Sequence, residues 1–327
     1  MDAGDLTNAD GPHEVAETDG ASDAADAGAA SDADVTPSGP RIVSISPAPG
    51  AKGVRADANI VVTFDRPMDK SRTSQAYQST DVPVSAANLT WNTQATQLTI
   101  NPSTDLQYAG GVVMTTPEAI PPRSYSFRIT AAAQDATGKT LQQPVSSSFT
   151  TLRRLAQGLV AKGDAVLSLS SLNETLPCTE GRVSFTAVKY MGRDRHKILV
   201  TFGISVLPAG VVNFEAASLG ANQVAVMDGS YSTGSVIAEH VREPLPIGDF
   251  HTGYSQVALR PLGTFSTNAN YEYKSVDVLA ALVADYTARR QHSQYRLDNT
   301  FAPQGGYGYA GFSCDLGFHL ATVYLVP

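Results

Sequence analysis

From residue 41 onward the chain consists of short runs of alternating apolar and polar residues separated by turn-forming residues. Arg41–Ile45, Gln97–Asn101 and Tyr125–Thr130 alternate, and Asn59–Phe64 is rich in Val and Ile. Proline and glycine mark the turns, as in Pro-Ala-Pro-Gly at 47–50. Because a β-strand points successive side chains to opposite faces, many short alternating segments with regular turns predict an all-β sandwich.

The first 39 residues have a different composition. Residues 1–40 contain ten acidic residues, no Lys or Arg and no aromatic residue. Such a segment cannot bury enough apolar surface to offset the entropy lost on ordering, so we expect residues 1–39 to form a disordered acidic tether. The rest of the chain carries 21 of the 31 acidic residues and all 23 Lys and Arg. This near-neutral balance disfavours a nucleic-acid partner.

Membrane and export signals are also informative. No run of 18 or more apolar residues occurs, so we expect no transmembrane segment. No charged and then apolar leader precedes the acidic segment, so we expect the export signal to be absent from this chain. Acidic Asp/Ala/Gly segments resemble the region that follows the lipidated cysteine in bacterial surface lipoproteins. That resemblance implies an N-terminal anchor that this chain lacks.

Six motifs follow one another between residues 40 and 151. They are Val43–Val54 with its Pro-x-x-Gly turn, Ile60–Asp69, Leu98–Pro102, Tyr125–Thr130, Asp135–Lys139 and Ser148–Thr151. In this order they resemble the bacterial Ig-like domain of S-layer-protein type. The resemblance implies a cell-surface spacer without catalytic residues.

The residues of these motifs have structural explanations. Gly50 and Gly138 occupy turns that need a positive φ. Asp135 is expected to accept hydrogen bonds from nearby backbone amides. The inward-facing core of the sandwich is predicted to contain Phe64, Leu98, Ile100, Tyr125 and Phe127.

Residues 152–163 are predicted to be a linker, in which Arg153-Arg154 is either a protease site or a solvated pair. Residues 164–327 again predict strands. Ser275–Arg290 differs, because its apolar residues recur at helical spacing, and Ser275 or Asp277 would cap the helix. The predicted strands are Asp164–Leu172, Val183–Tyr190, Lys197–Ile204, Val224–Met227, Ser235–Val241, Ser255–Leu259 and Leu320–Val326.

Four segments of this half resemble the DNRLRE-type domain, a jelly-roll module grouped with carbohydrate-binding modules. They are Arg195–Pro208, Gly210–Leu219, Tyr273–Tyr286 and His319–Tyr324. Tyr286 stands where the family usually has Trp. The fold expected for residues 164–327 is therefore a jelly-roll β-sandwich with one short helix, and a generic jelly roll is the alternative.

The chain has two cysteines, Cys178 and Cys314. Two cysteines 136 residues apart do not form a zinc site, which needs four ligands in close pairs. They predict one disulfide if the compartment is oxidising, and two buried free thiols are the alternative.

Aromatic and basic residues provide the candidate ligand contacts. Tyr307, Tyr309 and Phe312 are interleaved with glycines, so they either stack on sugar rings or pack the sandwich. Arg193 and Arg195 belong to a basic loop that would bind an acidic glycan or play a structural role. A structural calcium ion would use Asp164, Asp228 or Asp298, although no Asp-x-Asp-x-Asp cluster supports it.

No motif of catalysis occurs: the chain lacks His-Glu-x-x-His, Gly-x-Ser-x-Gly and Walker sequences. We therefore expect a non-catalytic, extracellular or surface-tethered binding and adhesion protein, with a polysaccharide or envelope component as partner. A structural subunit of a surface layer, coat or filament, which would self-associate, is the first alternative. A polysaccharide-degrading enzyme is the second.

Overall fold

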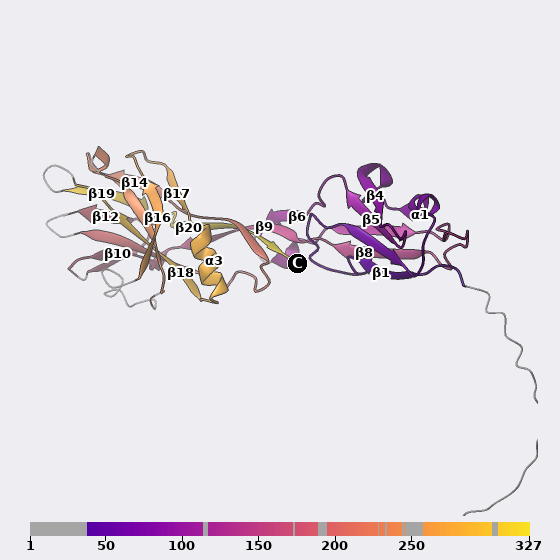
Figure 1. Ribbon diagram of the computed structural model, residues 1–327. Helices are drawn as coiled ribbons and strands as arrows, with labels where there is room; N and C mark the ends of the chain where they lie inside the picture. The colour runs from indigo at the N-terminus through magenta and orange to yellow at the C-terminus, as the bar shows by residue number, and fades with distance from the viewer. Residues whose placement is uncertain are drawn as a thin grey trace, which may run out of the picture. The chain divides into compact units, whose positions relative to one another are not determined.

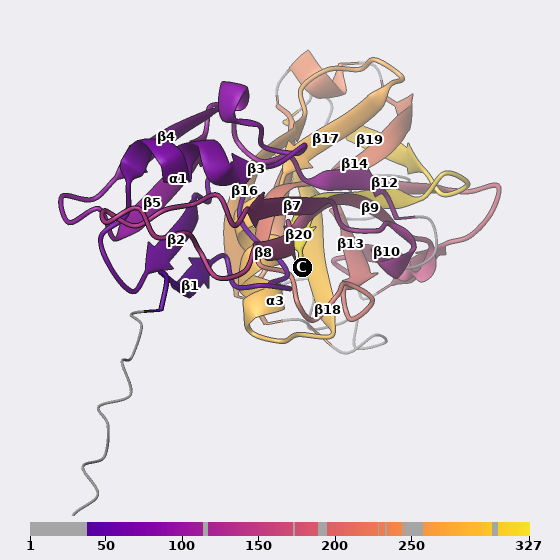
Figure 2. The same cartoon turned by 90° about the vertical axis from the view of Figure 1, so that its right-hand side faces the viewer.

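The computed structural model describes residues 38–113, 117–172, 174–188, 195–227, 229–232, 234–243, 245, 258–302 and 307–327. Gly39–Pro327 make up one compact unit. Strands dominate it, and Figures 1 and 2 show them from two directions with the helices α1 and α3. The all-β fold class is confirmed. In the described part of the chain, no helix has the length and apolarity that a bilayer crossing needs.

Two antiparallel sheets form the N-terminal sandwich. The first has the order β1 (Ile42–Ser46), β2 (Ile60–Phe64), β5 (Gln97–Pro102) and β4 (Ala87–Trp91), and the second has the order β3 (Tyr77–Gln78), β7 (Ser124–Ile129) and β8 (Val145–Thr150). Helix α1 (Lys70–Ala76) was not predicted. It begins after Asp69, whose carboxylate accepts the backbone N–H of Arg72.

The predicted core and turns of this sandwich are confirmed. Gly50 and Gly138 have φ values of 76° and 86°. One carboxylate oxygen of Asp135 accepts the backbone N–H groups of Thr137 and Lys139 at 2.9 and 3.0 Å. The five predicted core residues are all buried: Phe64, Leu98, Ile100, Tyr125 and Phe127.

Among the described residues, thirteen strands form one continuous sheet that includes the C-terminal half. Its main order is β16 (Leu259–Ser266), β15 (Val236–Val241), β18 (His292–Asn299), β13 (His196–Gly203), β12 (Val183–Val188), β19 (Gly308–Ser313), β14 (Asn213–Val226), β20 (Phe318–Val326), β9 (Arg153–Ala161) and β6 (Ala109–Val112). Beside this order, β10 (Gly163–Ser170) pairs with β13 and β11 (Thr175–Cys178), and β17 (Tyr273–Asp277) pairs with β14. All these pairs are antiparallel except β6–β9.

Strand β14 belongs to two parts of this sheet. Its residues 213–221 pair with β20, and its residues 223–226 pair with β19. The register shifts between Phe214 and Ala216 and again between Gln223 and Ala225. Such bulges bend a strand, so β14 carries the sheet around one hydrophobic core. The prediction of Val224–Met227 as a separate strand was therefore too short.

The predicted linker is wrong. Residues 153–161 form β9, and each of its nine residues pairs with β20. The guanidinium of Arg153 donates to the backbone oxygen of Pro327 and to that of Ile120, while Arg154 forms an ion pair with Glu215. The two consecutive arginines at the start of β9 favoured a solvated linker, although the next residue, Leu155, is fully buried. The other domain boundaries remain predictions.

One helix in the C-terminal half is confirmed, but it is shorter than predicted. Helix α3 spans Leu279–Thr287, and Ser275 lies in β17 instead. Asp277 accepts the backbone N–H of Leu279 at 2.8 Å, which agrees with its predicted capping role. Arg289 follows the helix with a φ of 55°, a left-handed position that glycine usually fills.

The disulfide between Cys178 and Cys314 is confirmed, with an S–S distance of 2.02 Å. It joins the end of β11 to the residue that follows β19. Both residues belong to the buried cluster of the C-terminal half. The alternative of two free thiols is wrong.

We predict that replacing Asp135 with Ala destabilises the N-terminal sandwich by about 2 kcal/mol, because two backbone amides of the turn and the Thr137 hydroxyl lose their acceptor. Burial acts to raise the pKa of Asp135, but hydrogen bonds from Thr137 and Lys139 hold this pKa below its ordinary value. A carboxyl whose pKa falls on folding adds stability that is lost as the pH falls through the folded-state pKa. Stability should therefore drop below about pH 4, and less steeply in the variant.

Urea unfolding followed by the fluorescence of Trp91, the single tryptophan, measures this effect. Asp105→Ala, at an exposed position, is the matched control and should change little. Equal unfolding midpoints for Asp135→Ala and wild type would contradict the assignment.

The disulfide should contribute about 4 kcal/mol, because it closes a loop of more than 100 residues in the unfolded chain. The double variant Cys178→Ala/Cys314→Ala should therefore melt at a lower temperature than the oxidised protein. Reductant should lower the melting temperature of the wild type and leave that of the double variant unchanged. A wild type that is insensitive to reductant would contradict this account.

Candidate functional site

The aromatic residues predicted from sequence separate in the structure. Phe312 is fully buried and packs against Phe265 and Phe318, so its prediction as a ligand contact is wrong. Its position in the middle of β19 places it on the core face, because inward and outward residues alternate along a strand. Tyr307 is 47% exposed and Tyr309 is half-buried, so both stay predictions.

The basic loop is described only in part. Arg195 forms an ion pair with Asp298 at 3.1 Å and donates to the backbone oxygen of Asn299. This arrangement fits the structural role weighed for it. Arg193 lies outside the described residues, so its prediction is untested.

The calcium prediction also remains untested. Asp298 already forms ion pairs with Arg195 and Lys197, and Asp228 lies outside the described residues. Among the residues that the structure describes, no group of three or more His, Cys, Asp or Glu gathers in a way that could hold a metal ion.

A different surface has the geometry of a binding site: the outer face of β9, β20, β14 and β17. On the inner face, Leu219 and Leu320 are neighbours in register and fully buried. The next residues along each strand therefore point outward, which places Gly220 beside His319. Small and short side chains follow on this outer face: Ala156, Gly158, Ser218, Ser275, Ala321 and Val323.

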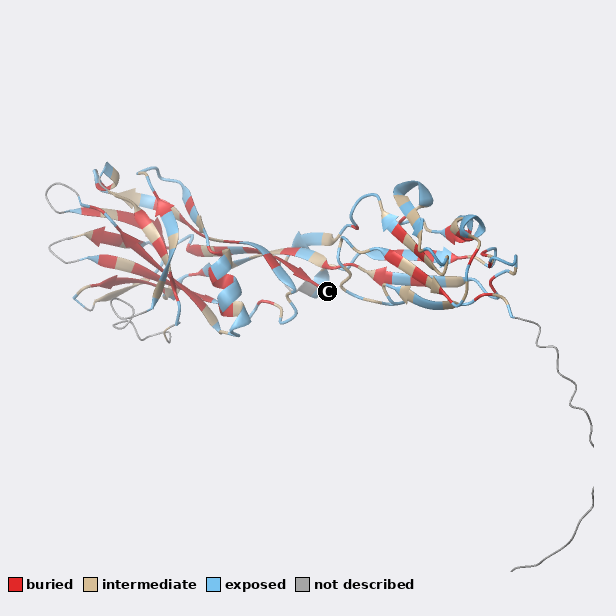
Figure 3. Ribbon diagram, viewed as in Figure 1, coloured by how far each residue is buried: buried red, intermediate tan, exposed pale blue. Residues whose placement is uncertain are grey.

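One groove crosses this face, and a second adjoins it at β6. The first has a volume of about 490 Å³, and Gly158, Ser218 and Ala321 are among the residues that line it. The second, of about 570 Å³, shares Val112, Ala156 and Val323 with the first. The two grooves therefore adjoin along β9 and β20, on strands whose buried residues alternate with exposed ones (Figure 3).

An aromatic side chain lies at one end of this face. Tyr273 is 48% exposed, and its ring centroid is 6.3 Å from that of His319. A methyl group added at Gly220 would lie 2.0 Å from the Tyr273 hydroxyl oxygen, so the tyrosine lies directly over the glycine backbone. Burial raises the pKa of the Tyr273 hydroxyl.

Buried polar groups hold the segment that leads to this tyrosine. The side-chain amide of Gln223 donates to the backbone oxygens of Asn268 and Asn270, both at 2.9 Å. Tyr231 donates its hydroxyl to the side-chain oxygen of Gln223. Burial raises the pKa of Tyr231 to about 12, so this donor keeps its proton at neutral pH. On the opposite side of β17 from Tyr273, Lys274 is buried and bonds Asn268.

A second polar cluster lies in the core. His240 and Ser293 both contact the same carboxylate oxygen of Asp285, at 2.9 and 2.6 Å, and Arg290 contacts the other oxygen. A catalytic triad instead requires the histidine to lie between the serine and the acid. Here the acid lies in the middle and is fully buried. The cluster therefore ties helix α3 to β15 and β18.

Comparison with known proteins identifies the first third of the chain. Residues 36–151 match the family model described as "Bacterial Ig-like domain". The bacterial Ig-like domain thus accounts for the N-terminal sandwich, and the sequence motifs had pointed to it. No curated protein matches the chain.

Several solved structures share remote similarity. An L,D-transpeptidase from Mycobacterium smegmatis is 15% identical, with 69% of this chain and 74% of that chain covered and a TM-score of 0.24. The S-layer protein rSbsC(31-844) is 11% identical, with 60% and 29% covered and a TM-score of 0.23. A two-domain protein of unknown function from Bacteroides fragilis is 7% identical, with 88% and 95% covered and a TM-score of 0.23. With TM-scores this low, these similarities indicate neither the fold nor the function of this chain.

Proposed function

We propose that this protein is a non-catalytic, surface-displayed binding protein whose C-terminal half holds a polysaccharide on the outer face of β9, β20, β14 and β17. The observation that carries the proposal is Tyr273, which lies over Gly220 on the same outer face as the groove beside Ser218 and Ser275. An aromatic ring stacks on the apolar C–H face of a sugar. A floor of small residues lets an extended chain lie close to the sheet.

The polar groups along the groove suit sugar hydroxyls. Ser218 and Ser275 line it, and each hydroxyl supplies a donor and acceptors. Its two carboxylates are already engaged, since Glu215 pairs with Arg154 and Asp277 accepts the N–H of Leu279. Committed carboxylates support binding over the polysaccharide-degrading alternative, for which turnover on a polysaccharide panel is the test.

The extracellular location belongs to the same proposal. The bacterial Ig-like domain and the disulfide both support it, because disulfides persist in oxidising compartments. The acidic tether, an N-terminal anchor and the DNRLRE-type jelly-roll fold belong to the same proposal, and composition and motifs of the sequence support them. Adhesion would follow from an anchored spacer that presents a glycan-binding face.

Self-association is the second candidate function. The outer face of small residues would also accept the same face of a second copy. Light scattering between about 1 and 100 μM separates the two functions, because a layer-forming subunit grows in mass with concentration.

The test compares two tyrosines of equal exposure. Tyr273→Ala should weaken polysaccharide binding about tenfold, because the stacking surface is lost. Tyr307→Ala is the matched control, since Tyr307 is 47% exposed and Tyr273 48%. Gly220→Val should also weaken binding, because its side chain displaces the tyrosine while valine suits a strand.

Affinity electrophoresis against cell-wall and exopolysaccharide fractions, followed by calorimetry with the best ligand, measures these changes. Loss of binding in Tyr307→Ala with none in Tyr273→Ala would move the site to β19, where the sequence predicted it. Absence of binding to every fraction would contradict the proposed function.

A further inference from the structure

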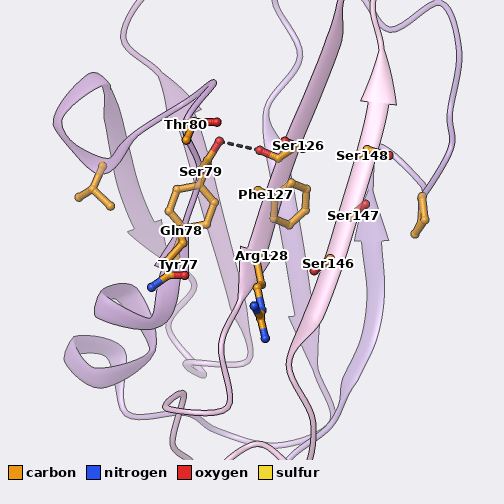
Figure 4. Close-up of a pocket in the computed structure, with 12 residues that line it drawn as sticks. Tyr77, Gln78, Ser79, Thr80, Ser126, Phe127, Arg128, Ser146, Ser147 and Ser148 are labelled. Atoms are coloured by element: carbon orange, nitrogen blue, oxygen red, sulfur yellow. Dashed lines mark hydrogen bonds between the residues drawn. The ribbon is translucent and has the colours of Figure 1, made fainter.

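A polar pocket opens in the N-terminal sandwich where β3 leaves β7. Only Tyr77 and Gln78 of β3 pair with β7. Beyond them, Ser79 donates its hydroxyl to the backbone oxygen of Ser126 at 2.6 Å, and Asp81 accepts the N–H of Ser126 at 2.8 Å. Two side chains thus take the place of the missing strand. The pocket has a volume of about 670 Å³ and is shown in Figure 4.

The pocket is lined by one positively charged side chain, that of Arg128. Arg128 lies on the solvent side of β7, because Phe127 and Ile129 on either side of it are buried. It is the single charged residue among those that line the pocket. Within the described residues, its guanidinium forms no ion pair and no hydrogen bond. Arg55 and Arg66 of the same sandwich form ion pairs, whereas the exposed Arg72, like Arg128, forms none among the described residues.

Two serine hydroxyls lie on the same outward face of the sheet as Arg128. Register places Ser146 of β8 directly beside Arg128, and Ser148 beside Ser126 on the same outward face. The side-chain hydroxyls of Ser146 and Ser148 have no hydrogen-bond partner among the described residues. Directly opposed residues have Cβ atoms about 5 Å apart, so one ligand group can contact both Arg128 and Ser146.

We infer that this pocket binds a polysaccharide that contains uronic acid, with Arg128 on the sugar carboxylate and the serines on neighbouring hydroxyls. A guanidinium presents two parallel N–H donors that match a carboxylate. Adjacent hydroxyl and amide side chains match the hydroxyls that flank the carboxylate of a hexuronate. The Ig-like part is then a second binding site and more than a spacer.

An acidic peptide fits the pocket less well. Peptides that dock on a sheet usually add a strand through free backbone groups. The backbone N–H and oxygen of Ser126 are already occupied by Asp81 and Ser79, so this edge of β7 is closed at the pocket. The pocket therefore offers side chains, which suit a hydroxyl-rich ligand.

Calorimetric titration of the full chain with oligogalacturonate at low and physiological salt tests this inference. Arg128→Gln should weaken binding about tenfold or more. The affinity of Arg128→Lys should lie between those of the wild type and Arg128→Gln, because lysine keeps the positive charge but lacks the two parallel N–H donors of a guanidinium. Arg55→Gln removes the same charge from an exposed position outside the pocket and should stay within about twofold of wild type. Methyl-esterified oligogalacturonate should not bind.

Four results would overturn the inference. Three concern the pocket itself: no binding of oligogalacturonate to the wild type, equal losses of affinity in Arg128→Gln and Arg55→Gln, or equally tight binding of an oligoglutamate peptide that is abolished by Arg128→Gln. The fourth concerns Tyr273. Tyr273→Ala should leave this binding unchanged. If Tyr273→Ala weakened oligogalacturonate binding and Arg128→Gln did not, the oligogalacturonate would bind on the C-terminal face. That result would also overturn the inference.

Discussion

The alternation of side chains along β20 determines both the core and the open face of the C-terminal half. Phe318, Leu320 and Tyr324 are fully buried, whereas His319 and Ala321 between them belong to the outer face. Because β20 pairs with β9 on one side and with β14 on the other, its register aligns the floor of the grooves. A shift of one residue would exchange the two faces. The core and the candidate site are therefore specified together.

Much of the strand architecture could be predicted from the sequence. In the N-terminal sandwich, turn glycines, Asp135 and the inward residues of β2, β5 and β7 behave as expected, because local turn chemistry and period-two patterning determine them. Helix α1 was missed because its seven residues, Lys-Ser-Arg-Thr-Ser-Gln-Ala, carry almost no apolar stripe. It starts at the Asp69 cap, which was the only local signal.

The candidate site was less accessible from the sequence. The Arg153-Arg154 pair favours a linker, yet residues 153–161 form β9, which supplies Ala156 and Gly158 to the grooves. The glycines around Phe312 suggest an exposed ring, but a glycine pattern does not tell which face of a strand a residue occupies. Tyr273 is a candidate because its ring lies over Gly220, which is 53 residues earlier in the chain. No pattern in a single sequence indicates such a long-range contact.

The central claim is that the outer face of β9, β20, β14 and β17 is the binding surface of the C-terminal half. Methyl NMR of the full chain during titration with the polysaccharide fragment that binds best tests it most directly. The account predicts shifts at Ala156, Ala321 and Val323, with little change at Val183 of β12, which pairs with β19. Shifts confined to Val183, or none at any of these four methyl-bearing residues, would contradict it.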